Sequence, residues 1–265
     1  MSTSTPNRKE QRERARAERK RREQEDALRA QRKRRLTYLG GGLVVVIAIV
    51  AIVIAVASGS GPGSSSPSGG GGVKNAAGVT HEFAGIPQNG NVLGASNAKA
   101  TMMVFADLQC PFCGEFERQA LPGIVSRYVK TGKLKIEFQP ISIIGNDSVA
   151  AARATAAAGL QNKLFQYSSL FYNNQGQENT GYVTDAFLTK LARAVPGLNV
   201  SRWKTDINSA KAGALLSQAQ SAAQTARVNS TPTFMVAKSG QTFGQFAPTS
   251  LTADAFYGKL DALTK

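Results

Sequence analysis

The chain has 265 residues and carries 32 Lys and Arg against 17 Asp and Glu, with one His and two Cys. This length allows one or two domains, and a hydrophobic content of 42% is enough to build a sizeable core. Two cysteines exclude a scaffold with several disulfides, and a single histidine argues against a four-ligand zinc site.

The first 35 residues carry much of the excess charge, with 14 Lys and Arg against 6 Asp and Glu. They contain almost no apolar side chains, so this segment cannot form a core. A nucleic-acid-binding arm is the weaker alternative, because no aromatic side chains alternate with the charges to stack on bases. We interpret residues 1–35 as a basic cytoplasmic tail and expect no nucleic-acid partner.

Residues 36–57 contain no charged side chain, and Val, Ile and Ala dominate their second half. About 20 apolar residues in a helix cross the hydrocarbon core of a bilayer, so this stretch predicts a single transmembrane helix. The basic flank before it predicts a cytoplasmic N-terminus and an extracytoplasmic remainder, held at the cell membrane. A cleaved signal peptide is the alternative, because Ala55, Val56 and Ala57 fit the cleavage pattern of small residues. Both interpretations place the remaining chain outside the cytoplasm.

Residues 58–75 are predicted to be a flexible linker, because residues 58–72 are only Ser, Gly and Pro. The rest of the chain, residues 76–265, has the size of one folded domain. We find no internal repeat in it.

The domain is predicted to begin with a hairpin over 78–94, where Gly, Pro and Asn separate short apolar segments. Two strands should follow, over 99–108 and over 133–141. Between them a helix is expected to begin at Cys110, because Pro111 suits the first helical position.

Apolar residues recur every three or four positions over about 145–228, which predicts several helices and no strand. Ser201 is expected to cap one of these helices. A strand over 233–237, a partner strand over 241–246 and a closing helix over 252–263 complete the chain. This order predicts an α/β domain with a helical insertion between its two halves.

Both cysteines lie in the motif Cys110-Pro111-Phe112-Cys113. A structural disulfide would close too short a loop to stabilise the fold much. A metal site would need further ligands, and His81 is the only histidine, which we interpret as a surface residue. A redox site fits better, because free N–H groups at a helix start favour a thiolate. Cys110 is then expected at the exposed tip and Cys113 within reach to resolve a mixed disulfide; no metal is predicted.

The run Phe105–Cys113 resembles the DsbA family of thioredoxin-fold proteins, and in particular the membrane-anchored DsbA-like thiol–disulfide oxidoreductases of bacteria. The segment Ser230–Phe234 resembles the loop that carries a cis-proline opposite the active site of this family. Roughly 90 residues separate Ile141 from Pro232, which leaves room for the family's helical insertion. The expected fold is an α/β thioredoxin fold with a helical insertion, preceded by one N-terminal transmembrane helix.

The resemblance implies that Cys110 attacks and is attacked, and that Cys113 resolves the mixed disulfide. The substrate-binding residues that it implies line a groove beside the cysteines: Thr231, Pro232 and Phe112. Asp107 matches the family pattern and is a candidate for proton transfer, with a turn or cap at the strand end as the alternative. Many relatives have an acid six residues before the first cysteine, where this chain has Val104.

The implied function is that of an extracytoplasmic oxidoreductase that oxidises cysteine pairs of exported proteins. Its partners would be reduced exported proteins and a membrane reoxidant of the DsbB or vitamin K epoxide reductase type. No cofactor is expected, because no cofactor motif is visible. A disulfide reductase or isomerase, and a tethered peptide-binding or chaperone module without redox turnover, are the alternatives.

Overall fold

The computed structural model describes residues 72–265. The predicted basic tail, transmembrane helix and most of the linker fall on residues 1–71, outside the described residues. From residue 72 onward, no helix combines the length and the apolar character needed to span a membrane.

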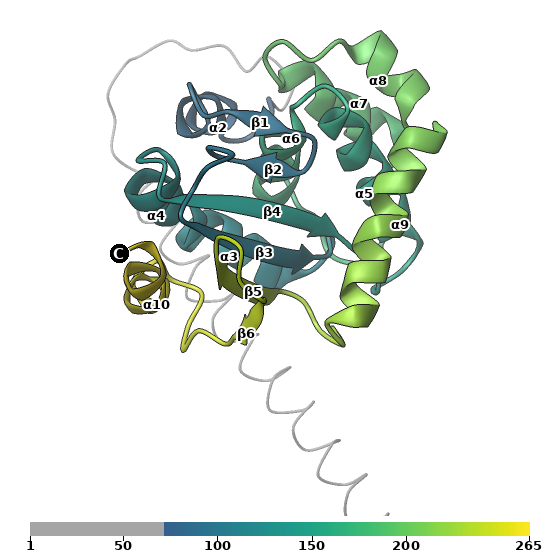
Figure 1. The fold of residues 1–265 in the computed structure, drawn as a ribbon. Helices are drawn as coiled ribbons and strands as arrows, with labels where there is room; N and C mark the ends of the chain where they lie inside the picture. Colours follow the sequence, from purple (N-terminus) through teal and green to yellow (C-terminus); the bar gives the residue numbers. More distant parts are fainter. Residues whose placement is uncertain (1–71) are drawn as a thin grey trace, which may run out of the picture. The chain divides into compact units, whose positions relative to one another are not determined.

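A six-stranded sheet in the order β1-β2-β4-β3-β5-β6 forms the centre of the domain (Figure 1). Its strands are β1 (Gln88–Asn89), β2 (Val92–Leu93), β3 (Ala100–Ala106), β4 (Leu134–Pro140), β5 (Thr233–Lys238) and β6 (Gly244–Phe246). The central strand β3 runs parallel to β4 and antiparallel to β5, with Val104 opposite Phe138 and Phe234. All but one residue of β3 are buried, which explains its continuous apolar run. The predicted strands are therefore confirmed.

Helices flank the sheet and form the insertion between β4 and β5. Those outside the insertion are α2 (Ala76–Glu82), α3 (Pro111–Gln119), α4 (Leu121–Ile124), the π-helical turn η1 (Val125–Val129) and α10 (Asp254–Thr264). The insertion contains α5 (Asn146–Gly159), α6 (Leu164–Asn173), α7 (Asp185–Ala194), α8 (Val200–Asp206) and α9 (Ala210–Thr225). The carboxyl ends of β3 and β4 point toward this insertion (Figure 1). The predicted insertion and closing helix are thus confirmed.

The predicted hairpin over 78–94 is wrong in its first half. Residues 76–82 form α2, and only β1 and β2 form the hairpin. Val79 and Phe83 are both buried, and their spacing of four residues places them on one face of a helical turn. His81 therefore lies on a helix, where it is exposed.

The predicted cap at Ser201 is also wrong. Asn199 caps α8 instead, because its side chain accepts a hydrogen bond from the Arg202 N–H at 2.9 Å. Ser209 caps the separate helix α9 by accepting from the Ala212 N–H at 3.2 Å. The segment that follows Leu198 therefore contains two helices, each with its own N-cap.

Three aromatic rings hold α3, β5 and α10 together. The ring centroids lie 4.8 Å apart for Phe116 and Phe234, 5.5 Å for Phe116 and Phe256, and 5.0 Å for Phe234 and Phe256. These tilted and edge-on contacts add to the energy of burying the rings. They fix α3, the helix that begins directly after Cys110, against β5, the strand that follows Pro232.

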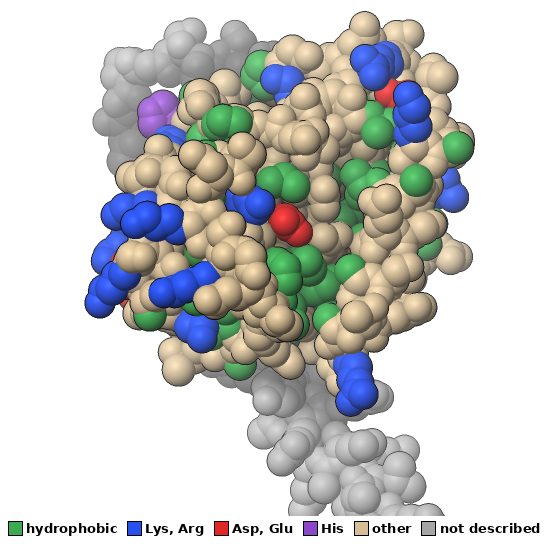
Figure 2. All heavy atoms as spheres, in the orientation of Figure 1, with side chains coloured by type: hydrophobic (Ala, Val, Ile, Leu, Met, Phe, Trp, Pro, Cys, Tyr) green, Lys and Arg blue, Asp and Glu red, His purple; other side chains and the backbone are tan. Residues whose placement is uncertain are grey.

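A second, smaller hydrophobic cluster lies between the sheet and α9. Its buried members are Phe105, Ile141, Ala219 and Ala223. Hydrophobic side chains reach the surface between the sheet and α9, whereas Lys and Arg side chains gather around α4 and α10 (Figure 2). The cluster fixes α9, the last helix of the insertion, just before the chain returns to β5.

Candidate active site

Cys110 occupies the N-cap of α3, directly after the loop that leaves β3. Its backbone is extended (φ −65°, ψ 120°), and Pro111 begins the helix. The Cys110 carbonyl accepts the first helical hydrogen bond from Gly114 N–H at 3.1 Å. The preceding N–H groups of the first turn have no helical acceptor, so they are available to the Cys110 sulfur.

The surroundings of the Cys110 thiol lower its pKa to about 6. The largest cause is a hydrogen bond from the Cys113 side chain. The Thr231 hydroxyl and the N–H groups of Cys113 and Phe112 also stabilise the thiolate, while burial opposes them. A substantial fraction of Cys110 is therefore ionised near neutral pH.

The sequence predicted Cys110 at an exposed tip, but the structure buries this residue. Only 4% of the residue is exposed, because the loop before β5 covers the sulfur. When protonated, the Cys110 thiol donates to the Thr231 carbonyl at 3.3 Å. A substrate must reach this sulfur from the edge of the groove that Thr231 helps to form.

Cys113 lies beneath Cys110 and is 1% exposed. Burial raises the pKa of its thiol well above the ordinary value, and the hydrogen bond to Cys110 and the charge there raise it further. The two free cysteines therefore differ in chemistry: Cys110 is a partly ionised nucleophile and Cys113 is a protonated thiol.

The three predicted substrate-binding residues lie together along one groove. Phe112 is 60% exposed at its rim, and the Thr231–Pro232 peptide bond is cis. The groove is lined by Phe112, Ser230, Thr231, Pro232, Thr233, Phe234, Gln245, Phe246, Ala247, Pro248 and Leu251. An apolar wall beside a reactive sulfur suits an extended peptide that carries a cysteine.

Asp107 is completely buried at the end of β3. Its Oδ1 accepts from the Gln109 N–H at 2.9 Å, and its Oδ2 accepts from the Ile143 and Ile144 N–H groups at 2.8 and 3.1 Å. The carboxylate thus ties the cysteine loop to the connection between β4 and α5. These three hydrogen bonds fit a turn at the end of the strand, which is the alternative that the sequence offered to a proton-transfer role for Asp107.

Two glutamines, neither singled out by the sequence, bind the cysteine loop to the helical insertion. Gln175 Nε2 donates to the Leu108 and Cys110 carbonyls at 2.8 and 3.0 Å. Gln109 Nε2 donates to Ser148 Oγ at 3.0 Å, and its Oε1 accepts from the Asn179 N–H at 2.8 Å. No sequence signal identifies Gln175, because its partners lie about 65 residues away.

Two acids near α3 were also missed by the sequence analysis. Glu117, on the buried face of α3, is 4% exposed, and Glu82 at the end of α2 is half-buried. The signal for Glu117 was its position one helical turn after Cys113, on the face that carries the apolar residues.

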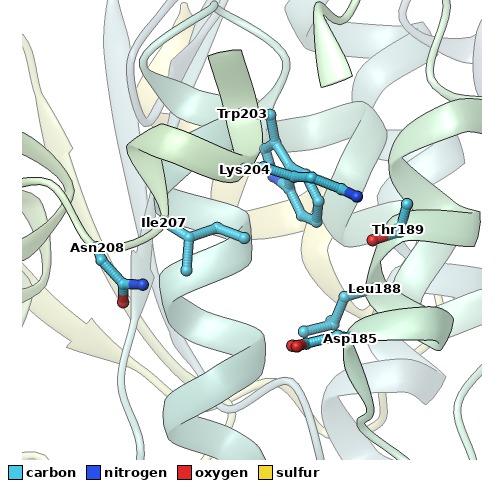
Figure 3. Close-up of a pocket in the computed structure, with 7 residues that line it drawn as sticks. All are labelled: Asp185, Leu188, Thr189, Trp203, Lys204, Ile207 and Asn208. Atoms are coloured by element: carbon cyan, nitrogen blue, oxygen red, sulfur yellow. The ribbon is translucent and has the colours of Figure 1, made fainter. Parts of the chain in front are cut away.

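A further pocket lies within the helical insertion, between α7 and α8 (Figure 3). It is lined by Asp185, Leu188, Thr189, Trp203, Lys204, Ile207 and Asn208. These residues include neither cysteine and no part of the Thr231–Pro232 loop, so this pocket is separate from the cysteine site. Among residues 72–265, no group of three or more His, Cys, Asp or Glu side chains is arranged to hold a metal ion.

Comparison with known proteins agrees with this geometry. The thioredoxin family profile matches residues 87–244. A probable disulfide bond formation protein D of Bacillus cereus is 26% identical over 147 residues, which cover 54% of this chain and 68% of the relative.

Solved structures show the same fold. Oxidised BdbD of Bacillus subtilis superposes with a TM-score of 0.58 at 19% identity, covering 68% of this chain and 97% of that one. Reduced DsbA of Mycobacterium tuberculosis superposes with a TM-score of 0.51 at 24% identity, covering 64% and 85%.

Proposed function

Because this chain belongs to the thioredoxin family and is a DsbA-like thiol–disulfide oxidoreductase, we propose that it oxidises cysteine pairs of exported proteins outside the cytoplasm. The observation that carries this proposal is the contrast between the lowered pKa of the Cys110 thiol and the raised pKa of the Cys113 thiol. The surroundings of Cys110 stabilise its thiolate, and this stabilisation is lost when the disulfide forms. A pair whose dithiol form is favoured in this way takes electrons from its substrates.

The proposed reaction starts from the Cys110–Cys113 disulfide. A substrate thiolate attacks the Cys110 sulfur, a mixed disulfide forms, and Cys113 leaves. The second substrate thiolate then attacks its partner sulfur in the mixed disulfide, and Cys110 leaves as a thiolate. The substrate loses two electrons and gains a disulfide, while the Cys110–Cys113 pair is reduced. The low pKa of Cys110 makes it a good leaving group in the last step.

The groove beside Cys110 is the proposed binding site for the substrate chain. Phe112 and Pro232 offer apolar contacts, and Thr231 offers backbone groups next to the sulfur. An extended peptide can pair with such a backbone, as a strand adds to a sheet edge.

Location and partners follow from the same proposal. Residues 36–57 would anchor the chain in the cell membrane, with the linker 58–75 before the domain 76–265 and the tail 1–35 in the cytoplasm. Disulfides persist outside the reducing cytoplasm, which suits an oxidase there. A membrane reoxidant of the DsbB or vitamin K epoxide reductase type would return the cysteine pair to the disulfide.

The stability of the two redox forms tests the direction of electron flow. The reduced protein is expected to unfold at a higher temperature than the oxidised one. The pKa of Cys110 is depressed in the folded dithiol form, so the Cys110 thiolate stabilises the reduced fold at high pH. This stabilisation is lost as the pH falls through about 6. Between that pH and the ordinary thiol pKa, the difference between the two forms should grow with pH, by at most about 1.4 kcal/mol per unit.

Calorimetry of the reduced and oxidised forms, at roughly one-unit steps from about pH 5 to about pH 9, measures this difference in stability directly. Groups that titrate identically in the reduced and oxidised forms contribute equally to both stabilities and so cancel in the difference. A more stable oxidised form across this range would instead support a disulfide reductase.

A further inference from the structure

One end of the central sheet carries a row of lysines. Strands β3 and β4 begin at this end and β5 ends there, because Ala100 lies opposite Leu134 on β4 and opposite Lys238 on β5. Lys99 and Lys133 directly precede the two parallel strands, and the Ala100 N–H donates to the Lys133 carbonyl at 3.2 Å. The three lysines therefore lie at the ends of three adjacent strands, which are spaced about 4.8 Å apart.

No negative charge pairs with this row. Lys99, Lys133 and Lys238 are exposed, and so is Lys130 in the turn that leads into β4. None of these side chains forms a hydrogen bond or an ion pair within the described part of the chain. Lys130 acts electrostatically on Glu82, but burial raises the pKa of that half-buried acid to about 7, so it is only partly ionised at neutral pH. We call these four residues the lysine cluster.

A structural role explains the lysine cluster poorly. Like charges that face each other on neighbouring strands destabilise a sheet. Lysines on the outer strands of a sheet can prevent pairing with other chains, but Lys99 precedes β3, the central strand, which is already paired on both sides. The cluster therefore opposes folding slightly, and an anionic partner would relieve the repulsion.

The lysine cluster lies at the opposite end of β3 from the cysteine site. Ala100 and Ala106, the two ends of β3, are roughly 20 Å apart at about 3.3 Å per residue. The end at which β3 and β4 begin lies beside α4 and α10 (Figure 1), where Lys and Arg side chains gather on the surface (Figure 2). A partner bound at the lysine cluster therefore leaves the groove beside Cys110 open to substrates.

On the basis of the membrane anchoring in the proposed function, we propose that the lysine cluster docks on anionic phospholipid headgroups and holds Cys110 away from the bilayer. Each lysine near an anionic membrane surface strengthens binding about fivefold. Residues 58–72, made only of Ser, Gly and Pro, have a typical reach of roughly 20 Å. Such a linker keeps the domain close to the bilayer, so that four individually weak contacts act together.

The test measures how fast each lysine is acetylated in the full-length chain after reconstitution into lipid vesicles. One set of vesicles contains only phosphatidylcholine, which is zwitterionic, and the other contains about one-third phosphatidylglycerol, which is anionic. A short pulse of a membrane-impermeant acetylating reagent, followed by mass spectrometry, gives the rate for each lysine of the domains that face outward. Lys204 and Lys211, both exposed on helices of the insertion, are the internal controls.

The lysine cluster should react about fivefold more slowly in anionic than in zwitterionic vesicles, whereas Lys204 and Lys211 should react equally in both. About 1 M NaCl shortens the screening length to about 3 Å and should abolish the difference. K99Q/K133Q should remove the protection of the two remaining lysines of the cluster. The matched control K204Q/K211Q loses the same charge from the insertion and should leave the protection unchanged.

Equal acetylation of the lysine cluster in the two kinds of vesicle would overturn the proposal, and so would protection that survives in K99Q/K133Q. Protection by soluble polyphosphate but not by anionic lipid would also overturn it, in favour of a polyanionic polymer. A chain that floats with neither kind of vesicle would reject the anchor and the docking together.

Oxidation of a dithiol peptide by the same samples tests the proposed redox function separately. Normal oxidation without lipid-dependent protection would reject the docking alone. Protection of the lysine cluster without any oxidation would reject the oxidoreductase chemistry and support the docking.

Discussion

Replacing Cys110 with Ser should reduce dithiol–disulfide exchange to the background rate, whereas replacing Cys113 with Ala should stop turnover after the first step. The Cys110 thiolate is the nucleophile because its pKa is lowered to about 6, whereas a hydroxyl is not ionised at neutral pH. Without Cys113 no thiol resolves the mixed disulfide, so C113A should accumulate covalent complexes with substrates. Non-reducing gels of cells that express each variant detect these complexes.

The double variant C110S/C113A is the matched control and should trap nothing. If C113A also traps nothing, while the chain still binds unfolded peptides, the tethered peptide-binding module becomes the better account. That outcome would mean that the groove lined by Phe112 and Pro232 acts without redox turnover.

Replacing Asp107 with Ala should lower the free energy of unfolding by about 3–5 kcal/mol. One buried and two part-buried N–H groups lose their acceptor, and each unpaired donor costs roughly 1–3 kcal/mol when it is buried, part of which water and relaxation recover. D107N keeps the volume and one acceptor oxygen, so its loss should be smaller. Urea denaturation of both variants measures the difference.

The same pair of variants separates the two roles considered for Asp107. D107N cannot transfer a proton, yet it preserves part of the turn. If Asp107 is an anchor, folded D107N should retain the pH dependence of the exchange rate. A flattened pH profile at native stability would reinstate Asp107 as a proton-transfer group.

Local sequence signals predicted the parts of the site that are set by neighbouring residues. The apolar run of β3, the proline after Cys110 and the Thr231-Pro232 pair before β5 each carry their own pattern. These signals suffice for the strand, helix and strand that meet at the cysteines. They also placed the helical insertion, because its apolar period is long and regular.

Other features depend on contacts between distant segments. Cys110 is covered by a loop 121 residues further along the chain, which no local pattern reveals. The first element, α2, was mistaken for a strand because Val79 and Phe83 fit either geometry in so short a segment. Glu82 and Glu117 lie 35 positions apart and come together only because both helices pack on α6.

The ionisation of Cys110 is the property on which the account depends, and alkylation of the reduced chain measures it directly. Burial raises the pKa of the Cys113 thiol well above the ordinary value and keeps it protonated, so iodoacetamide should react with the Cys110 thiolate alone in the folded protein. The reaction rate plotted against pH should show a midpoint at about 6. A midpoint near 9, the ordinary value for a thiol, would contradict the account.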